Sequence, residues 1–472
     1  MSSASLRSSP ASPRALRPAS IDHDRVIALT ERERTVYRER TARSGEYFQR
    51  ASGVMPGGVP SQFQKNDPWP VYVERGRGAR VWDVDGNEYL DFHNGFGVMC
   101  VGHANPVVAA AVKARMDEGT HFAAPTEGSI VVAEELRRRW GLPQWRFTNS
   151  GTESTMDAVH LARGSTGREV IVKIEGSYHG HHDAVMVSVK PPPALMGDRD
   201  RPTSVAYGLG YPANTPELTR VVPFNDAEAL ASLLEELRGR VAGVIMEPAM
   251  MNINIVPPVA GYLERVRELT RDHGAVLIFD EVKTGAAVAP GGATELFGVT
   301  PDVVCLAKAI CGGLPGGAIG MTAELGALIA SGQVRQQGTF NGNPLVMAAA
   351  EATLTRVLTD EGYAKLHRLN EDLMAGCERV IASYGLPAHT VGMGSKGCVV
   401  FSTEPVREYR DYLTKVHHEL TNLAWLYHMN NGIFMTPGED EEWTLSVLHG
   451  DEDLRRYLEV FDRFARDVTS AG

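Results

Sequence analysis

The segment VVCLAKAICGGLPGGAIGM, residues 303–321, contains one charged side chain, that of Lys308, among aliphatic residues, two cysteines and five glycines. Burying an unpaired ammonium group is costly unless its pKa falls or a carboxylate pairs with it. Two interpretations are open at this point. Lys308 is either a structural amine that reaches solvent or a buried carboxylate, or a catalytic amine of the kind that forms a Schiff base.

The segment TNSGTESTMDAVHLAR offers a site for an anion. A strand-like run ends before Ser150, Gly151 and Thr152, and an amphipathic helical pattern follows them. Free backbone N–H groups and hydroxyl groups at a helix N-terminus suit a phosphate group. Taken alone, the same residues are also those of an ordinary helix N-cap.

Asp280 closes the apolar run of AVLIFDEVKTG. Its carboxylate is therefore expected to be buried and to need a cationic partner or a hydrogen-bond donor. The alternative is a structural ion pair with no role in chemistry.

The segment GSYHGHHD follows another strand-like run. Its Tyr178 can lie flat against an aromatic ligand. The neighbouring His179, His181 and His182 raise the question of a metal, but no acidic or thiolate side chain stands at the spacing that zinc sites use. We therefore expect no metal here.

These four features together meet the needs of one cofactor, pyridoxal phosphate. Its aldehyde condenses with a lysine, its phosphate needs an anchor, its ring needs a flat neighbour, and its ring nitrogen needs an anionic partner to stay protonated. We therefore expect Lys308 to bind the aldehyde and Asp280 to face the ring nitrogen.

Composition narrows the class of protein. The 472 residues include 58 acidic and 47 basic ones, for a formal charge of -11, and the basic residues are scattered, which argues against a nucleic-acid partner. No apolar run approaches the roughly 18 residues of a membrane helix, so we expect no membrane partner. The five cysteines are widely spread with no CxxC pair, which is typical of reduced thiols in a cytoplasmic enzyme.

Short apolar runs alternate with longer helical patterns, which predicts a parallel sheet wrapped by helices. The runs lie near residues 145, 169, 241, 275, 303 and 317. In such sheets the ligand crevice lies outside the carboxyl ends of the strands. Residues 149–152, Glu247, Asp280 and Lys308 close these runs and are therefore expected to meet at one site.

We predict two α/β domains and a terminal extension. Residues 1–25 form a disordered extension, 26–85 the first part of a small domain, 86–345 a large cofactor-binding domain, and 346–472 the rest of the small domain. Residues 1–21 are rich in Ser, Arg, Pro and Ala and contain no acidic residue. This composition fits a flexible extension better than an organelle targeting segment, and both interpretations stay open.

A set of motifs resembles a known family. They read VMPGGVPS, WDVDGNEYLDF, GHANP, FTNSGTEST, GSYHGHHD, EPAMMN, FDEVKTG, FGVTPDVVCLAKAICGGLPGGAIG and GTFNGNP. Over about residues 40–350 the sequence is similar to the class III aminotransferases of fold type I, and within them to the glutamate-1-semialdehyde 2,1-aminomutases. The resemblance implies a mainly parallel seven-stranded sheet wrapped by helices, a smaller α+β domain built from both termini, and a homodimer with shared active sites.

The resemblance also implies a role for individual residues. Lys308 matches the lysine of the internal aldimine and Asp280 the partner of the ring nitrogen. The remaining matches are Ser150, Gly151 and Thr152 in the phosphate loop, Tyr178 against the ring with His179 beside it, Asn252 near the phenolic oxygen, and Thr339 as a phosphate ligand from the other subunit.

Departures from the family pattern bear on the substrate. Gln64 stands where the aminomutases have an arginine that meets the substrate carboxylate, Phe96 stands where tryptophan is common, and Lys283 replaces an apolar or amide residue. Glu441, by contrast, aligns with an acidic residue used near the substrate amine. This mixture favours a transaminase for an amine or amino acid, which leaves pyridoxamine phosphate for an oxo acceptor. The alternative is the aminomutase, which gives 5-aminolevulinate.

Two other classes fit less well. The GxGxxG match at residues 392–397 precedes a strand-like run, whereas a nicotinamide site needs a helix there. A non-catalytic scaffold has no need for Lys308, Asp280 and the Ser-Gly-Thr turn together. The segment 189–215, rich in Pro and Gly, is either a mobile lid or a surface insertion.

Overall fold

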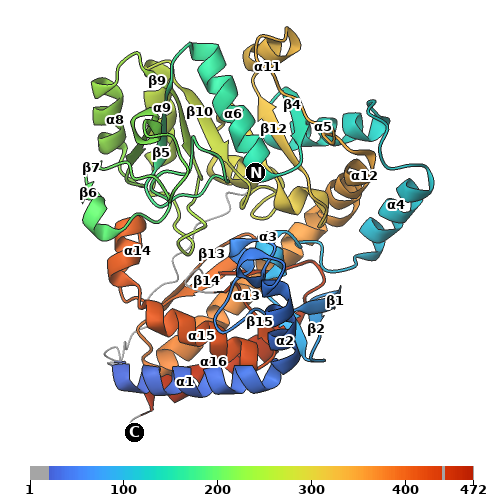
Figure 1. The fold of residues 1–472 in the computed structure, drawn as a ribbon, viewed down its shortest axis with the longest axis vertical. Helices are drawn as coiled ribbons and strands as arrows, with labels where there is room; N and C mark the ends of the chain where they lie inside the picture. The colour runs from blue at the N-terminus through green and yellow to red at the C-terminus, as the bar shows by residue number, and fades with distance from the viewer. Residues whose placement is uncertain (1–20, 438–441, 471–472) are drawn as a thin grey trace.

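The computed structural model describes residues 21–437 and 442–470, and its larger part is built on a seven-stranded sheet (Figure 1). The strand order is β4-β12-β11-β10-β9-β5-β8. The strands are β4 (Gln144–Thr148), β5 (Val170–Ile174), β8 (Thr219–Val222), β9 (Val241–Met246), β10 (Val276–Asp280), β11 (Val303–Leu306) and β12 (Gly317–Met321).

The sheet is mainly parallel. Strands β8, β5, β9, β10 and β11 run in one direction, and β12 is antiparallel to its neighbours β11 and β4. The central strands are buried along their whole length, which is why they read as continuous apolar runs in the sequence. The predicted fold is thus confirmed. Only β8, a short strand, was missing from the predicted runs.

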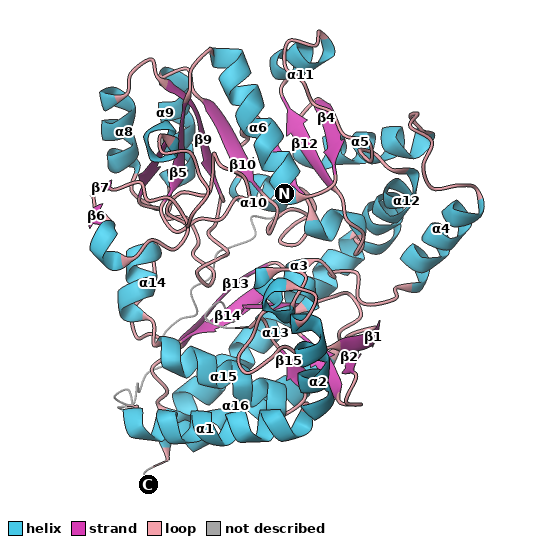
Figure 2. Ribbon diagram, viewed as in Figure 1, coloured by secondary structure: helices cyan, strands magenta, loops and turns pink. Residues whose placement is uncertain are grey.

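Helices cover both faces of this sheet (Figure 2). Buried residues of α8 (Ala227–Glu236) and α9 (Tyr262–Asp272) pack in one cluster with β5 and β9. Buried residues of α6 (Gly151–Thr166) and α11 (Ala323–Ala330) pack in another. The two faces of the sheet are therefore shielded from water, which leaves the carboxyl ends of its strands as the place for a ligand crevice.

A second group of strands joins the two ends of the chain. One sheet has the order β1-β2-β3-β15 and another the order β13-β14-β16. These strands are β1 (Val73–Arg77), β2 (Arg80–Asp83), β3 (Glu88–Asp91), β13 (His389–Met393), β14 (Lys396–Val400), β15 (Ile433–Phe434) and β16 (Glu442–Thr444). Because β3 pairs with β2 and with β15, this sheet extends to Asp91, past the boundary predicted at residue 85.

The helices outside the large sheet follow the predicted pattern in outline. They are α1 (His23–Arg40), α2 (Ala42–Ser52), α3 (Asn94–Gly97), α4 (Pro106–Asp117), α5 (Glu127–Trp140), α7 (Thr215–Leu218), α10 (Gly292–Phe297), α12 (Pro344–Ala352), α13 (Asp360–Tyr384), α14 (Tyr409–Lys415), α15 (His418–Asn430) and α16 (Asp451–Thr469). Helix α1 begins inside the predicted extension 1–25, because the Asp22 carboxylate accepts hydrogen bonds from the backbone of Asp24 and Arg25 and caps it.

The segment 189–215 is tied to helix α14. It contains the short hairpin β6 (Gly197–Asp198) and β7 (Arg201–Pro202), whose backbone accepts hydrogen bonds from Arg410. The guanidinium of Arg199 also pairs with Glu408 at 2.8 Å. Both interpretations of the segment 189–215, a mobile lid and a surface insertion, stay open.

Two further observations concern the described residues. All five cysteines are buried and free of disulfides. None of the helices in this part of the chain has the length and apolar character needed to cross a membrane.

Candidate active site

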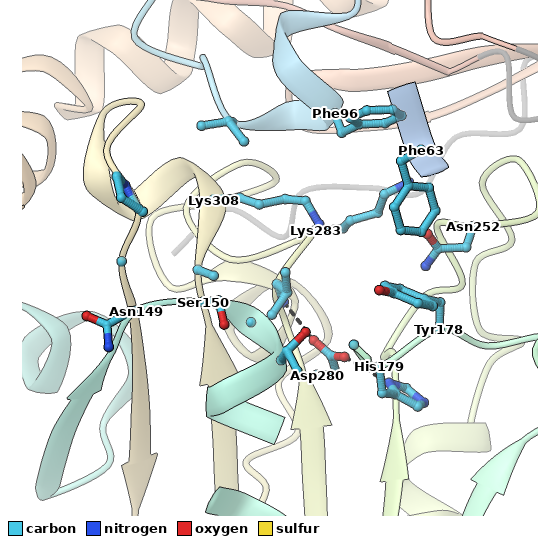
Figure 3. Close-up of a pocket in the computed structure, with 18 of the residues that line it drawn as sticks. Phe63, Phe96, Asn149, Ser150, Tyr178, His179, Asn252, Asp280, Lys283 and Lys308 are labelled. Atoms are coloured by element: carbon cyan, nitrogen blue, oxygen red, sulfur yellow. Dashed lines mark hydrogen bonds and ion pairs between the residues drawn. The ribbon is translucent and has the colours of Figure 1, made fainter. Parts of the chain in front are cut away.

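A pocket of about 490 Å³ opens at the carboxyl ends of the large sheet's strands. Figure 3 shows side chains from several loops converging on it. Its lining comprises Phe63, Phe96, Val98, Asn149, Ser150, Gly151, Thr152, Tyr178, His179, Gly180, Glu247, Asn252, Asp280, Val282, Lys283, Ala307, Lys308, Gly313, Leu314, Pro315, Gly316 and Thr436. The volume suits a small-molecule ligand with a bound cofactor.

Lys308 follows β11 and opens the short 3-10 helix η4 (Lys308–Cys311). Its φ of 51° is left-handed, a conformation that costs energy in a residue with a side chain and is found mainly at functional sites. The side chain points into the middle of the pocket (Figure 3), and within the described residues its amine makes no hydrogen bond. Burial, with help from the positive charge of Lys283, lowers the pKa of Lys308 to about 8. The amine is thus suited to act as a nucleophile.

Asp280 ends β10 and is held by two neighbours. Its Oδ2 lies 2.8 Å from His179 Nδ1, and its Oδ1 accepts a hydrogen bond from the backbone N–H of Val282 at 3.0 Å. Burial lowers the pKa of His179, which favours the neutral ring. The adjacent Glu281 points elsewhere and accepts hydrogen bonds from Ala293 and Thr294. Asp280 is therefore the carboxylate that faces the pocket.

The predicted phosphate turn lies at the start of helix α6. The Ser150 side chain caps the helix by accepting from the backbone N–H of Glu153 at 3.2 Å. The Thr152 hydroxyl accepts from the backbone N–H of His181 at 3.1 Å and so joins this turn to the GSYHGHHD loop. A 16-residue helix directs its N-terminal N–H groups and its positive dipole end at the pocket.

Tyr178 forms one wall of the pocket. Phe63 contacts it edge to face, with 5.3 Å between ring centroids. The buried Lys173 donates to the carbonyl oxygens of Ser177 and Val187 and thereby fixes the loop that carries Tyr178. Lys173 is therefore a structural amine.

Asn252 lies next to Glu247 on the same wall. Its amide nitrogen is 3.0 Å from both carboxyl oxygens of Glu247, which also accepts from the backbone of Met251. Burial raises the pKa of Glu247 to about 7. This carboxyl group is therefore partly protonated near neutral pH.

Other predicted residues lie at the margin or outside the pocket. Gln64 is exposed and does not line it, and Thr339 is exposed on a turn away from it. Phe96 lines the pocket and contacts the ring of His93, with 4.3 Å between centroids. Glu441 falls outside the described residues.

Two residues to which the motifs gave no role also line the pocket. Phe63 lines the pocket where Gln64 was expected to act. Lys283 pairs with Glu442 of β16 at 2.7 Å. The motif FDEVKTG places Lys283 three residues after Asp280, so the sequence indicated that this lysine lies near the site. Its partner Glu442 could not be found in this way, because it lies far away in the sequence.

The pocket residues fit pyridoxal phosphate. An added Cβ on Gly151 would lie 2.8 Å from a methyl group of Val282. The turn at Ser150 therefore packs directly against Val282, which forms the floor of the pocket. A buried amine, a buried carboxylate and a helix N-terminus surround this floor. Lys308 would hold the aldehyde, Asp280 the ring nitrogen, and the turn at Ser150 the phosphate.

Comparisons with known proteins agree with this fit. A family model described as aminotransferase class-III matches residues 62–422. A glutamate-1-semialdehyde 2,1-aminomutase from Bacillus licheniformis is 40% identical over 430 residues, covering 89% of this chain and 97% of the relative.

Solved structures are also similar to this chain. An omega-transaminase from Sphaerobacter thermophilus is 36% identical with a TM-score of 0.87, covering 92% of this chain and 100% of that one. A variant of a glutamate-1-semialdehyde-aminomutase from Pseudomonas aeruginosa PAO1, solved in complex with PMP, is 29% identical with a TM-score of 0.87, covering 95% and 99%.

Proposed function

Since the chain belongs to the class III aminotransferases, a family of pyridoxal phosphate enzymes, we propose that it moves an amino group within glutamate-1-semialdehyde, as the name of its curated relative describes. The observation that carries the chemistry is one pocket in which the amine of Lys308, the carboxylate of Asp280 and the N-terminus of helix α6 meet. The identity of 40% over most of the chain supports the aminomutase over the transaminase that the sequence departures favoured.

Each residue has a task in this proposal. Pyridoxal phosphate, when bound, supplies an aldehyde to carry the amino group and a ring to hold the electron pair released at the substrate carbon. The Asp280 side chain would lie at the ring nitrogen as its hydrogen-bond partner, and the turn at Ser150 would hold the phosphate. Lys308, whose pKa burial lowers to about 8, would move a proton at the substrate carbon through its Nζ.

A second candidate is a transaminase with two substrates. Gln64 is exposed, and no arginine stands among the described residues that line the pocket. The carboxylate clamp that the aminomutases use is therefore not at that position. The similarity to an omega-transaminase also favours this alternative.

We also propose a cytoplasmic homodimer with shared sites. The five buried cysteines, none of which forms a disulfide, suit a reducing compartment. The exposed Thr339 turn is available to reach the pocket of a second copy.

A single-substrate assay separates the two functions. The purified, cofactor-loaded protein is given glutamate-1-semialdehyde alone, and products are followed by chromatography. The proposal predicts many turnovers to 5-aminolevulinate with no added oxo acid. If product stops near one equivalent per site and resumes when an oxo acid is added, the protein is a transaminase.

A further inference from the structure

Glu247 joins two loops that form one wall of the pocket. It directly follows strand β9 and is only 3% exposed. Its Oε2 accepts a hydrogen bond from the backbone N–H of Met251 at 3.0 Å, and its Oε1 accepts one from the backbone N–H of Tyr178 at 3.4 Å. One carboxyl group therefore ties the loop that carries Tyr178 to the loop that carries Asn252.

The same carboxyl group sets the orientation of the Asn252 amide. The side-chain nitrogen of Asn252 lies 3.0 Å from both oxygens of Glu247. An ionised carboxylate only accepts hydrogen bonds, whereas the nitrogen of an amide group donates and its oxygen accepts. Glu247 therefore favours the orientation in which the amide nitrogen faces it. Because the two N–H bonds of an amide diverge widely, one N–H serves Glu247 and the second points elsewhere.

This orientation matters for the predicted role of Asn252. The residue lines the pocket close to Tyr178 (Figure 3) and is predicted to lie near the phenolic oxygen of pyridoxal phosphate. That oxygen carries negative charge and accepts hydrogen bonds. An N–H group of Asn252 suits it, whereas a reversed amide would place one acceptor against another.

We propose that Glu247 is a positioning residue, which orients the Asn252 amide so that its N–H, and not its oxygen, is offered to the phenolic oxygen of the cofactor. This inference rests on the proposed pyridoxal phosphate chemistry and adds a residue to it. It holds for the aminomutase and for the transaminase.

Charged groups from several elements act on Glu247. Asp280 at the end of β10 raises the pKa of Glu247, and Lys283 in the following loop lowers it. Glu247 in turn raises the pKa of Lys173 of β5. A neutral residue in place of Glu247 thus changes the electrostatics of the pocket as well as the orientation of Asn252, and a test must separate the two effects.

A double-mutant cycle separates them. Glu247→Gln, Asn252→Ala and Glu247→Gln/Asn252→Ala are loaded with pyridoxal phosphate, and the absorbance of the cofactor on Lys308 is titrated with pH in the absence of substrate. A hydrogen bond donated to the phenolic oxygen favours loss of the proton that this oxygen shares with the lysine nitrogen. Loss of the oriented N–H therefore raises the pH midpoint, whereas loss of the Glu247 charge alone lowers it.

The expected result is a strong coupling between the two sites. Without Asn252 there is no amide left to orient, so Glu247→Gln should then show the effect of charge alone. The acid dissociation constants measured for Glu247→Gln with and without Asn252, each relative to its parent, should differ by about 3- to 10-fold, the usual worth of one hydrogen bond.

A matched control is available in helix α1. Glu33 is also buried, and its Oε2 accepts a hydrogen bond from the side-chain nitrogen of Asn430 at 2.7 Å, outside the set of residues that line the pocket. Glu33→Gln should leave the midpoint of the cofactor unchanged. If Glu247→Gln does not fold, Glu247→Asp takes its place in the cycle, because it keeps the negative charge and withdraws the carboxylate from Asn252 by one methylene group.

The proposal is overturned if the folded Glu247 variant shifts the midpoint by the same amount with and without Asn252, since Glu247 would then act through its charge alone. An unchanged midpoint, as in Glu33→Gln, would also overturn it and leave Glu247 a merely structural role. Failure of the wild-type protein to bind pyridoxal phosphate would instead refute the proposed function. Because no substrate is present, the results do not depend on which substrate the protein uses.

Discussion

The amine of Lys308 differs from the other buried amines in what surrounds it. Lys173 donates to backbone carbonyls and Lys396 to a threonine hydroxyl, whereas Lys308 stands at the centre of the pocket on a left-handed residue. A strained residue persists only where the surrounding structure enforces it. Lys308 is therefore held for chemistry, while Lys173 and Lys396 are held for structure.

The pKa of Lys308 predicts how its reactivity depends on pH. Burial lowers that pKa from the ordinary 10.5 to about 8, so the neutral, nucleophilic amine becomes the major form above pH 8 instead of above pH 10.5. The rate at which cofactor-free protein combines with pyridoxal phosphate should rise with pH and reach half its maximum near pH 8. Stopped-flow absorbance between pH 6 and about 10.5 measures it. A midpoint near 10.5 would mean that the site does not desolvate the amine.

Helix α6 and the loop after β10 pack against each other and together position the phosphate turn of the pocket. The glycine at the first position of α6 lets Val282 pack directly against the turn, because an added Cβ there would lie 2.8 Å from a methyl group of Val282. The phosphate turn and the floor of the pocket therefore act as one unit.

Gly151→Ala tests this unit. The new methyl group would meet Val282 at 2.8 Å and force the turn outward. Overpacking of this kind costs about 1–3 kcal/mol, so we expect the dissociation constant of pyridoxal phosphate to rise about 10-fold or more. Gly53→Ala is the control, because its added Cβ meets only a carbonyl oxygen at 3.4 Å in a right-handed residue. Equal cofactor affinity in both variants would contradict the close approach.

The sequence predicted the site residues that follow the strands of the large sheet. It did not predict those that come from the second group of strands. Asp280, Lys308 and the Ser150 turn follow strand ends, so strand patterns alone bring them together. Glu442 and Lys396 could not be placed in this way, because they come from a different sheet whose position relative to β10 depends on packing between distant segments. Gln64 was singled out, yet its neighbour Phe63 lines the pocket, since a one-residue shift in a short 3-10 turn changes which side chain points inward.

Over the whole molecule, the pocket is lined both by residues of the large sheet, such as Asp280, and by residues next to the second group of strands, such as Thr436 after β15. Figure 1 shows these two parts of the molecule facing each other. The Lys283–Glu442 pair joins the loop after β10 to β16, and β15 pairs with β3 to join the late segment of the chain to the early one. A change in the packing between the large sheet and the second group of strands will therefore change the shape of the pocket.

The proposed shared site predicts complementation between two defective chains. In a mixed dimer of Lys308→Ala and Thr339→Val, one pocket holds both substitutions and the other holds neither. Co-purified mixed dimers should then recover close to half the wild-type activity, while each parent dimer stays impaired. Mixed dimers no more active than the parents would show that Thr339 does not serve the neighbouring pocket.

The most direct test of the account is to identify the lysine that binds the cofactor. The protein is loaded with pyridoxal phosphate, reduced with borohydride, digested and mapped by mass spectrometry. We expect one pyridoxyl adduct, on Lys308. An adduct on Lys173, Lys283 or Lys396 in its place would contradict it.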